Sequence, residues 1–379
     1  MTDIYRRLGI TPVINCATTY TRLGGSVMAP EVTAAMAAAA PAFVDIHALQ
    51  VAVGQRLAEV TSNEAAYVSN GAAAGIAIAT AAAVCGDDPA LMARLPRRLD
   101  GMRDQVVVHR TQRLWYDHAV RQIGVELVEI GHTYETQTWE LDDALGDRTA
   151  AVVYFAGSHL NRNTLPLPYV VDRAHAHGVP VIVDAAAQVP PMSNLWRFTR
   201  ECGADVAVFS GGKSIGGPQN SGLAVGTPRM IRLMRLNGPP NQGLTRTMKV
   251  AKETMIGLLT AVERYVSLDH DAVAASWDAV VDDWVAAWAG LSCRVIRSAS
   301  NEAGEPVPRV LLELETARAR DELVAHLRAG DPPIEVVLHD ERSVALSSHL
   351  LQPGEAQIVR ERVLRVASPV GVRGPARLA

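Results

Sequence analysis

Short runs of apolar residues recur along the first two thirds of this chain, and segments with helical spacing separate most of them. A strand formed by such a run is apolar on both faces and has to be covered on both; the clearest runs are 106–108, 150–155, 181–183 and 206–209. Strands of this kind that alternate with helices predict a mostly parallel, doubly wound α/β sheet. Another run, 222–226, predicts one more strand that hairpins back to the edge of the sheet.

The pattern of elements changes after about residue 268. Before that point, apolar positions at helical spacing predict helices over 30–40, 46–60, 72–84, 115–123, 140–146, 168–177 and 249–268. Beyond it, helical and extended segments alternate differently, over 277–291, 294–297, 309–314, 317–328 and 334–338. We therefore predict three parts: an N-terminal segment over 1–30 that borders the active site, a large α/β domain over 31–268, and a smaller α+β domain over 269–379.

Charge and cysteine usage restrict the partners of the chain. A net charge of −4 and a pI near 6.3 disfavour nucleic acid and anionic membranes, which attract an excess of lysine and arginine. The cysteines form neither the close pairs of a zinc site nor a dense disulfide framework, so we expect no metal site; they are Cys16, Cys85, Cys202 and Cys293. The N-terminus lacks the apolar core of a signal peptide. These features predict a soluble, cytoplasmic protein with a small-molecule partner.

Lys213 is one of only three lysines and follows the apolar run 206–209 in the sequence Ser-Gly-Gly-Lys-Ser. A nucleotide-binding P-loop is disfavoured, because Ala207 stands where the motif needs a glycine and Gly216–Pro218 cannot continue as a helix. A lysine at the carboxyl end of a strand is instead well placed to attack an aldehyde and form a Schiff base. The alternative is a solvated lysine in a tight turn.

Asp184 ends another apolar run, 181–183, and favours the Schiff-base interpretation of Lys213. A buried carboxylate needs a partner, and the protonated pyridine nitrogen of pyridoxal phosphate (PLP) is a partner that lets the ring withdraw electrons. With Lys213 at the end of a neighbouring strand, the two residues predict a PLP site, and we expect Ala186 beside the cofactor. The alternative is a helix-capping or loop aspartate.

A strand-to-helix turn of small residues, Ser69–Gly75, offers a site for the phosphate of the cofactor. The backbone N–H groups of such a turn lie at a helix N-terminus, where the helix dipole favours an anion. We expect the phosphate to contact this turn and the serine before the lysine; the residues are Ser69, Asn70, Gly71, Ala72, Ala73 and Ser210. Many turns share this pattern, so it gains weight only together with Lys213 and Asp184.

His109 and Arg110 follow an apolar run, where an imidazole can stack on a pyridine ring and a guanidinium can bind a carboxylate. We predict His109 as a catalytic and cofactor-contacting residue and Arg110 as a substrate residue. Ser158 follows the run 150–155 and is a further substrate candidate, with helix capping as its alternative role. The sequence assigns no role to His118.

Three cations lie at helical spacing near the start of the segment 249–268; they are Arg246, Lys249 and Lys252. They predict an anion site with Arg246 as a substrate contact, and the alternative is a solvated helix face. Two of the three lysines of the chain lie here, which favours the anion site.

In these motifs the chain resembles the selenocysteine synthase-like family of fold-type I PLP enzymes, and within it the relatives of D-glucosaminate-6-phosphate ammonia-lyase type. The matching stretches run in order from about residue 5 to 265; they are 13–15, 21–26, 43–46, 67–74, 183–187, 209–213 and 248–253. The resemblance implies an aspartate aminotransferase-like fold, a Schiff base on Lys213, a pyridinium partner in Asp184, and phosphate contacts from the Gly71 turn and Ser210. It also implies a homodimer or larger homo-oligomer, with Thr21 beside the substrate.

The resemblance favours a PLP-dependent lyase that removes the α-proton of an amino acid or amino-sugar acid and then eliminates a β-substituent. Racemisation or epimerisation, with His109 or His159 as a second acid, and transamination use the same core residues and stay open. A tRNA-dependent transferase is less favoured, because the chain is acidic and is expected to enter the catalytic region within about ten residues, without the further N-terminal domain of tRNA-acting relatives. Gln188 stands where the sugar-acid lyases are expected to carry an acidic residue.

Overall fold

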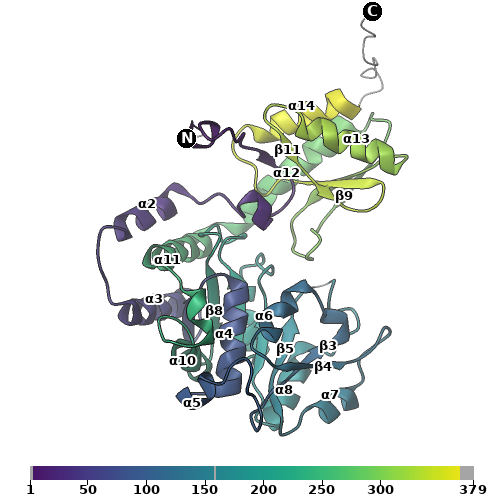
Figure 1. Ribbon diagram of the computed structural model, residues 1–379. Helices are drawn as coiled ribbons and strands as arrows, with labels where there is room; N and C mark the ends of the chain where they lie inside the picture. Colours follow the sequence, from purple (N-terminus) through teal and green to yellow (C-terminus); the bar gives the residue numbers. More distant parts are fainter. Residues whose placement is uncertain (1–2, 158, 368–379) are drawn as a thin grey trace, which may run out of the picture. The chain divides into compact units, whose positions relative to one another are not determined.

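The computed structural model describes residues 3–157 and 159–367 (Figure 1). The chain forms two compact units, and neither is continuous in sequence. The large unit comprises 26–268 and 303–305, and the small unit comprises the described parts of 1–25, 269–302 and 306–379. The N-terminal segment therefore folds with the C-terminal part of the chain rather than with the residues that follow it.

A seven-stranded sheet organises the large unit, in the order β2-β8-β7-β6-β5-β3-β4. Neighbouring strands are parallel from β7 to β4, and β8 is antiparallel to both β7 and β2. The strands are β2 Ala65–Ser69, β3 Gln105–His109, β4 Glu126–Ile130, β5 Thr149–Phe155, β6 Val181–Asp184, β7 Val206–Ser210 and β8 Gly222–Gly226. The mostly parallel α/β sheet predicted from the sequence is confirmed.

The position of β8 differs from the prediction, which places this strand at the edge of the sheet. In the structure β8 lies between β7 and β2, and β2 forms the edge. The hairpin from β7 does fold back, with Ser210 opposite Gly222, and β2 then pairs with the other side of β8, with Ser69 also opposite Gly222. An alternation of apolar runs does not encode this order, because β2 and β8 are far apart in sequence.

Helices cover both faces of the sheet and divide its core in two. One face packs against α4 (Ala72–Cys85), α6 (His118–Arg121) and α10 (Pro228–Asn237). The other face packs against α2 (Pro30–Ala39), α3 (Ile46–Val60), α7 (Thr138–Ala144), α8 (Leu167–Ala176) and α11 (Lys252–Ser267). Nearly every residue of α4 is buried, and its run of alanines and glycine lets the helix lie close to the sheet.

Two predicted helices of the large unit differ from the observed ones. The segment 115–123 forms a short 3-10 helix, η3 (Trp115–Asp117), followed by the single turn of α6. α11 begins at Lys252 rather than at 249, because Lys249 and Ala251 have extended backbones. The remaining short helices are α1 Asp3–Arg6, η1 Thr21–Leu23, α5 Pro89–Met92, η2 Arg110–Gln112, α9 Asn194–Trp196, η4 Arg197–Glu201 and η5 Leu244–Met248. Within the described residues, no helix combines the length and apolar character that crossing a membrane requires.

The small unit has a four-stranded antiparallel sheet, in the order β12-β13-β10-β9, and a separate parallel pair formed by β1 and β11. Its core contains Trp284 and Trp288, whose rings stack with centroids 5.2 Å apart. The elements are β1 Ile14–Asn15, α12 His270–Trp288, β9 Arg294–Ser298, β10 Arg309–Glu313, α13 Ala317–Arg328, β11 Ile334–Glu335, β12 Val337–Leu338, β13 Ser343–Ser347 and α14 Glu355–Ala367. The smaller α+β part predicted near the C-terminus is confirmed.

The single strand predicted over 334–338 is in fact two strands that belong to two sheets. β11 pairs in parallel with β1, with Ile14 opposite Ile334, whereas β12 pairs with β13. The two strands are adjacent and similarly apolar, so they form one run in the sequence. The partner strand β1 has only two residues, which is too short for an alternating pattern to reveal.

Candidate active site

Asp184 and Lys213 lie near each other at the carboxyl edge of the large-unit sheet. Asp184 ends β6, and the parallel neighbour β7 ends at Ser210, three residues before Lys213. The Asp184 Oδ1 accepts a hydrogen bond of 3.0 Å from the Ala186 N–H. Burial raises the pKa of the Asp184 carboxyl, while the Ala186 N–H and the charge of Lys213 act in the opposite direction. The carboxyl and the amine therefore interact electrostatically.

A tight hairpin rich in glycine presents Lys213. The Gly211 N–H donates to the Ser221 carbonyl oxygen at 2.9 Å, which closes the hairpin between β7 and β8. A Cβ atom on Gly212 would lie 2.3 Å from the Cα of Gln219, so no larger residue fits between the two arms. Backbone packing thus requires glycine directly before Lys213, and it fixes the point at which the lysine leaves the strand.

The turn between β2 and α4 presents backbone N–H groups without a side-chain cap. Gly71 at the helix N-cap has a φ of 85°, a conformation that favours glycine. The Ser69 hydroxyl is buried and donates to the Gly71 carbonyl oxygen at 2.9 Å, so it shapes the turn. The first helical hydrogen bond runs from the Gly75 N–H to the Gly71 carbonyl at 3.1 Å, which leaves the N–H groups of Ala72 and Ala73 outside the helical ladder.

Ser69, Asp184 and Ser210 all point to the face of the sheet that α4 covers. Side chains alternate along a strand, and each of the three shares its face with core residues packed against α4, such as Val208 before Ser210. A Cβ atom on Gly75 would lie 2.9 Å from the Ser69 Oγ and 2.7 Å from the Val208 Cγ1. The N-terminus of α4 and the ends of β2, β6 and β7 therefore meet on one face.

His109 lies on the opposite face, where it is fully buried. Side chains two residues apart on a strand share a face, and Val107 belongs to the core on the side of the sheet away from α4. The His109 Nε2 accepts a hydrogen bond of 3.2 Å from the Leu165 N–H, and its ring packs edge-on against Tyr154 with centroids 5.6 Å apart. Burial lowers the pKa of His109 to about 4, so the imidazole is neutral at physiological pH. This placement in the core differs from the predicted stacking of the ring on a cofactor.

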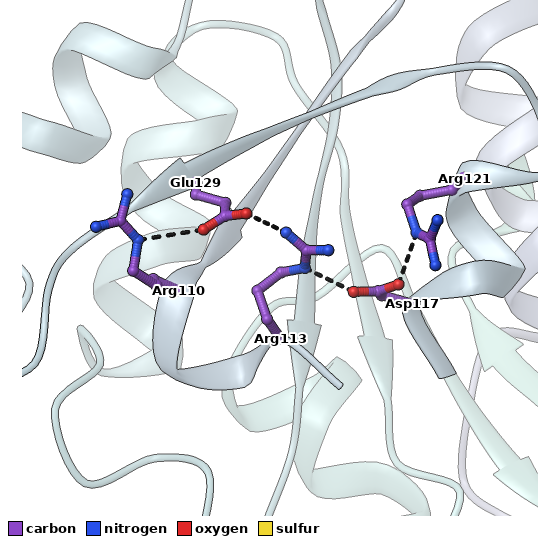
Figure 2. A network of polar contacts seen from close by, with 5 residues as sticks. All are labelled: Arg110, Arg113, Asp117, Arg121 and Glu129. Atoms are coloured by element: carbon purple, nitrogen blue, oxygen red, sulfur yellow. Dashed lines mark hydrogen bonds and ion pairs between the residues drawn. The ribbon is translucent and has the colours of Figure 1, made fainter. Parts of the chain in front are cut away.

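Arg110 begins a ladder of ion pairs on the surface beside β3 (Figure 2). The Arg110 Nε lies 3.1 Å from the Glu129 Oε2, and the same carboxylate also pairs with Arg113. Asp117 then joins Arg113 and Arg121 at 2.6 and 2.8 Å. Arg110 is therefore paired with Glu129, and it would have to leave this carboxylate to bind a substrate.

Two other predicted substrate residues belong to different units. Thr21 lies in η1 of the small unit, and Arg246 lies half-buried in η5 of the large unit. Ser158 falls outside the described residues. His159 and Gln188 both lie near Gly157 after β5, since a Cβ atom on Gly157 would be 3.0 Å from the His159 Cε1 and 3.6 Å from the Gln188 Nε2. Across residues 3–157 and 159–367, no three His, Cys, Asp or Glu side chains gather in a way that could hold a metal ion.

Lys252 from the predicted cation cluster has a structural role. Its Nζ donates to the carbonyl oxygens of Ala39 and Ala40 at 3.0 and 2.8 Å, and it also pairs with Glu253. These carbonyl groups lie at the C-terminus of α2, where the helix dipole favours a cation. The lysine therefore caps α2, while Lys249 is exposed.

Two polar residues at the carboxyl edge lie outside the motifs predicted from the sequence. Gln112 bridges β3 and the loop after β5, because its Oε1 accepts from the Phe155 N–H at 3.1 Å and its Nε2 donates to the Asn161 Oδ1 at 3.0 Å. The Thr111 Oγ1 is buried and, like the Asn70 Oδ1 near α4, has no hydrogen-bond partner in the described part of the chain. Neither Gln112 nor Thr111 lies in a recognisable motif, so only the folded environment reveals them.

Most of the chain matches a known protein family. The family SelA, described as L-seryl-tRNA selenium transferase, matches residues 13–276. The chain belongs to this family. The matched residues include the whole seven-stranded sheet, the β2–α4 turn and the lysine hairpin.

Full-length relatives of this SelA-family chain have different named activities. D-Glucosaminate-6-phosphate ammonia lyase from Salmonella typhimurium is 32% identical, with 96% of this chain and 98% of the relative covered. 5'-C-Glycyluridine monooxygenase-decarboxylase from a Streptomyces species is 34% identical, with 94% and 90% covered. L-Seryl-tRNA(Sec) selenium transferase from Moorella thermoacetica is 25% identical, with 93% and 80% covered.

Solved structures agree with the family assignment. The structure of D-glucosaminate-6-phosphate ammonia-lyase superposes with a TM-score of 0.83 at 32% identity, and the match covers 96% of this chain and 98% of that one. A serine palmitoyltransferase from S. paucimobilis has a TM-score of 0.59 at 18% identity, covers 92% and 86%, and shares the fold alone. The SelA-family chain has the fold of the fold-type I PLP enzymes, and these likenesses support an enzyme of the ammonia-lyase type.

The carboxyl edge of this SelA-family chain fits PLP on its own geometry. The α4 N-terminus presents N–H groups that an anion can accept. The half-buried Asp184 carboxyl, whose pKa is raised by desolvation, would be stabilised in its charged form by a cationic ring nitrogen. The enclosed Asn70 Oδ1 has no partner within the described residues, as expected of an atom that faces a ligand.

Proposed function

We propose that the chain is a PLP-dependent lyase of the ammonia-lyase type that acts on an amino acid or amino-sugar acid. The electrostatic pairing of Asp184 with Lys213 at the ends of β6 and β7 carries this proposal. A carboxylate on the α4 face and an amine that interacts with it are the groups that the ring nitrogen and the aldehyde of PLP require. The 32% identity with the Salmonella ammonia lyase supports the reaction type.

Each residue of this edge has a distinct role in the proposal. The N–H groups of Ala72 and Ala73, together with Ser210, bind the phosphate, and the dipole of α4 stabilises its charge. Asp184 would accept the N–H of the protonated ring nitrogen, and Lys213 would hold the aldehyde group of the cofactor. When bound, the cofactor supplies an electron sink that makes the Cα–H bond of the substrate acidic.

In this proposal the Lys213 amine would be the base that takes the Cα proton of the substrate. In a 2-amino-3-hydroxy acid, the resulting ammonium can give a proton to the C3 hydroxyl group, which leaves as water. Hydrolysis of the unsaturated amine that remains yields ammonia and a 2-oxo acid. The water lost in the first step is regained in the second, so the net loss from the substrate is ammonia.

The test combines the visible absorbance of the purified protein with ammonia release from D-glucosaminate 6-phosphate. Wild type should bind added PLP with a visible absorbance band that hydroxylamine removes. Lys213→Ala should lose this band and ammonia release, whereas the matched control Lys249→Ala, at an exposed lysine, should keep both. A wild type that stays colourless with PLP, or a Lys213→Ala variant that keeps the hydroxylamine-sensitive band, would contradict the proposal.

A second candidate is an oxygen-dependent decarboxylation, favoured by the 34% identity with the Streptomyces monooxygenase-decarboxylase. In this reaction O2 is consumed and the substrate carboxylate leaves as CO2. Oxygen uptake coupled to CO2 release, without ammonia release under anaerobic conditions, would identify it. Loss of optical rotation without any of these products would instead indicate a racemase, and consumption of a 2-oxo acid an aminotransferase.

We also propose that the enzyme works in the cytoplasm as a homodimer or larger homo-oligomer. The family resemblance supports the assembly, and four free cysteines without a disulfide framework support the location. Light scattering of the PLP-loaded enzyme and fractionation of expressing cells test these two points.

A further inference from the structure

Residues 159–166 form a loop at the carboxyl edge of the large unit, between β5 and α8. Leu160 packs into the core on the α4 side of the sheet, whereas Leu165 belongs to the core on the other side. The loop therefore crosses the edge of the sheet, and its first residues lie on the face to which Asp184 points. His159, the first of them, is exposed and so accessible to a ligand.

His159 lies beside the turn that follows Asp184. Strands β5 and β6 are parallel neighbours, with Phe155 opposite Asp184. The His159 ring and the amide of Gln188, four residues after Asp184, both adjoin the Cβ position of Gly157, at 3.0 and 3.6 Å. No hydrogen bond or ion pair occupies the His159 ring within the described part of the chain. Its nitrogen atoms are therefore available to a molecule bound at this edge.

A fully buried glutamine, Gln112, holds the stretch that carries His159. The Gln112 Nε2 donates to the Oδ1 of Asn161, two residues after His159, at 3.0 Å. The Gln112 Oε1 accepts from the N–H of Phe155, the last residue of β5, at 3.1 Å. One side chain from the segment after β3 thus fixes both ends of this stretch, and loss of either bond leaves a polar group without its partner.

An imidazole held in this position suits a substrate with oxygen atoms on its carbon chain. In the neutral ring one nitrogen donates a hydrogen bond and the other accepts one, and a hydroxyl group can do both. An apolar side chain offers neither. A site that hydrogen-bonds a hydroxyl group discriminates against an analogue that lacks it, because the polar group of the protein then stays unpaired.

We propose that His159 hydrogen-bonds a hydroxyl group of the substrate beyond Cα, and that Gln112 holds His159 in position through Asn161. The inference rests on the proposed function, which places the substrate beside Asp184. It narrows the substrate class to hydroxylated amino acids, which include the amino-sugar acids, over amino acids with apolar side chains. His159 is in this view a specificity residue, and Gln112 is a positioning residue.

Calorimetric titration of the PLP-loaded, full-length protein tests the contact without catalysis. The probes are gluconate and hexanoate, two acids of equal chain length that lack an amine, and only gluconate carries hydroxyl groups. The variants are His159→Ala and His159→Gln. The matched control is His177→Ala, at an exposed histidine that ends α8 just before the amino end of β6.

Wild type should bind gluconate about tenfold more tightly than hexanoate, and His159→Ala should lose most of this preference while its hexanoate affinity is unchanged. His159→Gln should recover part of the preference, because an amide also donates and accepts. His177→Ala should match wild type. A wild type that does not distinguish the two acids, or an equal loss for both probes in His159→Ala, overturns the proposal.

Paired changes at Asn161 test the positioning role of Gln112. Asn161→Asp keeps the acceptor for the Gln112 Nε2 and should keep the preference for gluconate, whereas Asn161→Leu removes it and should lose the preference, as should Gln112→Leu. Adding His159→Ala to Asn161→Leu should then cause little further loss, because both changes remove the same contact. Additive losses would show that Gln112 only stabilises the fold. If Gln112→Leu does not fold, the two Asn161 variants decide.

Carbethoxylation by diethyl pyrocarbonate, measured by peptide mass spectrometry, separates this contact from the proposed function. Gluconate should shield His159 from the reagent and leave His177 reactive. Shielding of His159 in a protein that stays colourless with PLP would refute the proposed function and leave the contact standing. An enzyme that binds PLP and releases ammonia, but whose His159 is not shielded, would refute the contact alone.

Discussion

Strands β3 and β6 end alike in sequence, Val-Val-Val-His109 and Val-Ile-Val-Asp184, yet their last residues serve different parts of the molecule. Asp184 points to the α4 face and interacts with Lys213. His109 points to the other face, accepts a hydrogen bond from Leu165 and packs on Tyr154. A polar residue at a strand end therefore identifies the functional edge of a sheet, but only its face decides whether it reaches the site.

The largest expected effect is at Asp184. Asp184→Asn should reduce kcat/KM about 10³-fold, roughly 4 kcal/mol of transition-state stabilisation, because a neutral amide does not keep the ring nitrogen protonated. The control is Asp205→Asn, which makes the same change of a carboxylate to an amide at the side chain that accepts from the Val181 N–H at the opposite end of β6. Steady-state kinetics should show the control within about threefold of wild type once stability is matched. Full activity in Asp184→Asn would show that Asp184, like His109, is not needed for the reaction.

At His109 we expect a loss of stability rather than of chemistry. His109→Leu leaves the buried Leu165 N–H without its acceptor and should reduce the free energy of unfolding by about 1–3 kcal/mol. The kcat of the folded variant should stay within about threefold of wild type. Urea unfolding and kinetics on the same preparation measure both. A hundredfold fall in kcat at unchanged stability would return His109 to the catalytic residues.

The pH dependence of stability should carry opposite signs for the two residues. The pKa of His109 is lowered to about 4, so the unfolded chain binds this proton first as the pH falls, and His109 destabilises the fold between about pH 6.5 and 4. The pKa of Asp184 is raised, so the folded chain holds this proton more tightly, and its stabilising effect is lost as the pH rises through that pKa.

Urea unfolding of the cofactor-free protein at pH 7 and pH 5 measures these slopes. His109→Leu should lose less stability on acidification than wild type, by about 1–2 kcal/mol. Asp184→Asn should lose slightly more. His349, whose pKa is also lowered to about 4, remains in all three proteins and cancels from the differences. Equal slopes in wild type and His109→Leu would show that His109 titrates normally.

The smallest effect is expected at Arg110, directly after His109. Arg110→Gln removes an exposed end of the ion-pair ladder and should change the free energy of unfolding by less than about 0.5 kcal/mol. Arg113→Gln is the sharper comparison, because Arg113 joins Glu129 to the buried Asp117 in the middle of the ladder (Figure 2) and should cost more. A tenfold rise in KM for Arg110→Gln alone would show that this arginine leaves Glu129 to bind the substrate.

Much of the large unit could be predicted because its strands are buried on both faces. Such strands appear as continuous apolar runs, and the residues that follow them identify the carboxyl edge, as with Asp184 and Lys213. The position of β8 could not be predicted, since strand order is set by contacts between distant segments. The face of the sheet to which His109 points could not be predicted either. A strand that is apolar on both faces has no alternation of polar and apolar residues to distinguish the two faces.

The small unit was less predictable because some of its strands pair with segments that are far away in the sequence. β1 is a two-residue strand whose partner lies near the other end of the chain, and β11 and β12 form one apolar run although they belong to two sheets.

The pairing of Ile14 with Ile334 has a consequence for how the chain emerges from the ribosome. Domains generally fold in the order in which they are synthesised. Here, however, the first strand is made long before its partner, and the complete sequence of the large unit lies between them. The N-terminal segment with β1 therefore has no partner strand while the seven-stranded sheet folds. Nascent chains released before β11 should accordingly contain a folded large unit and an N-terminal segment open to proteases.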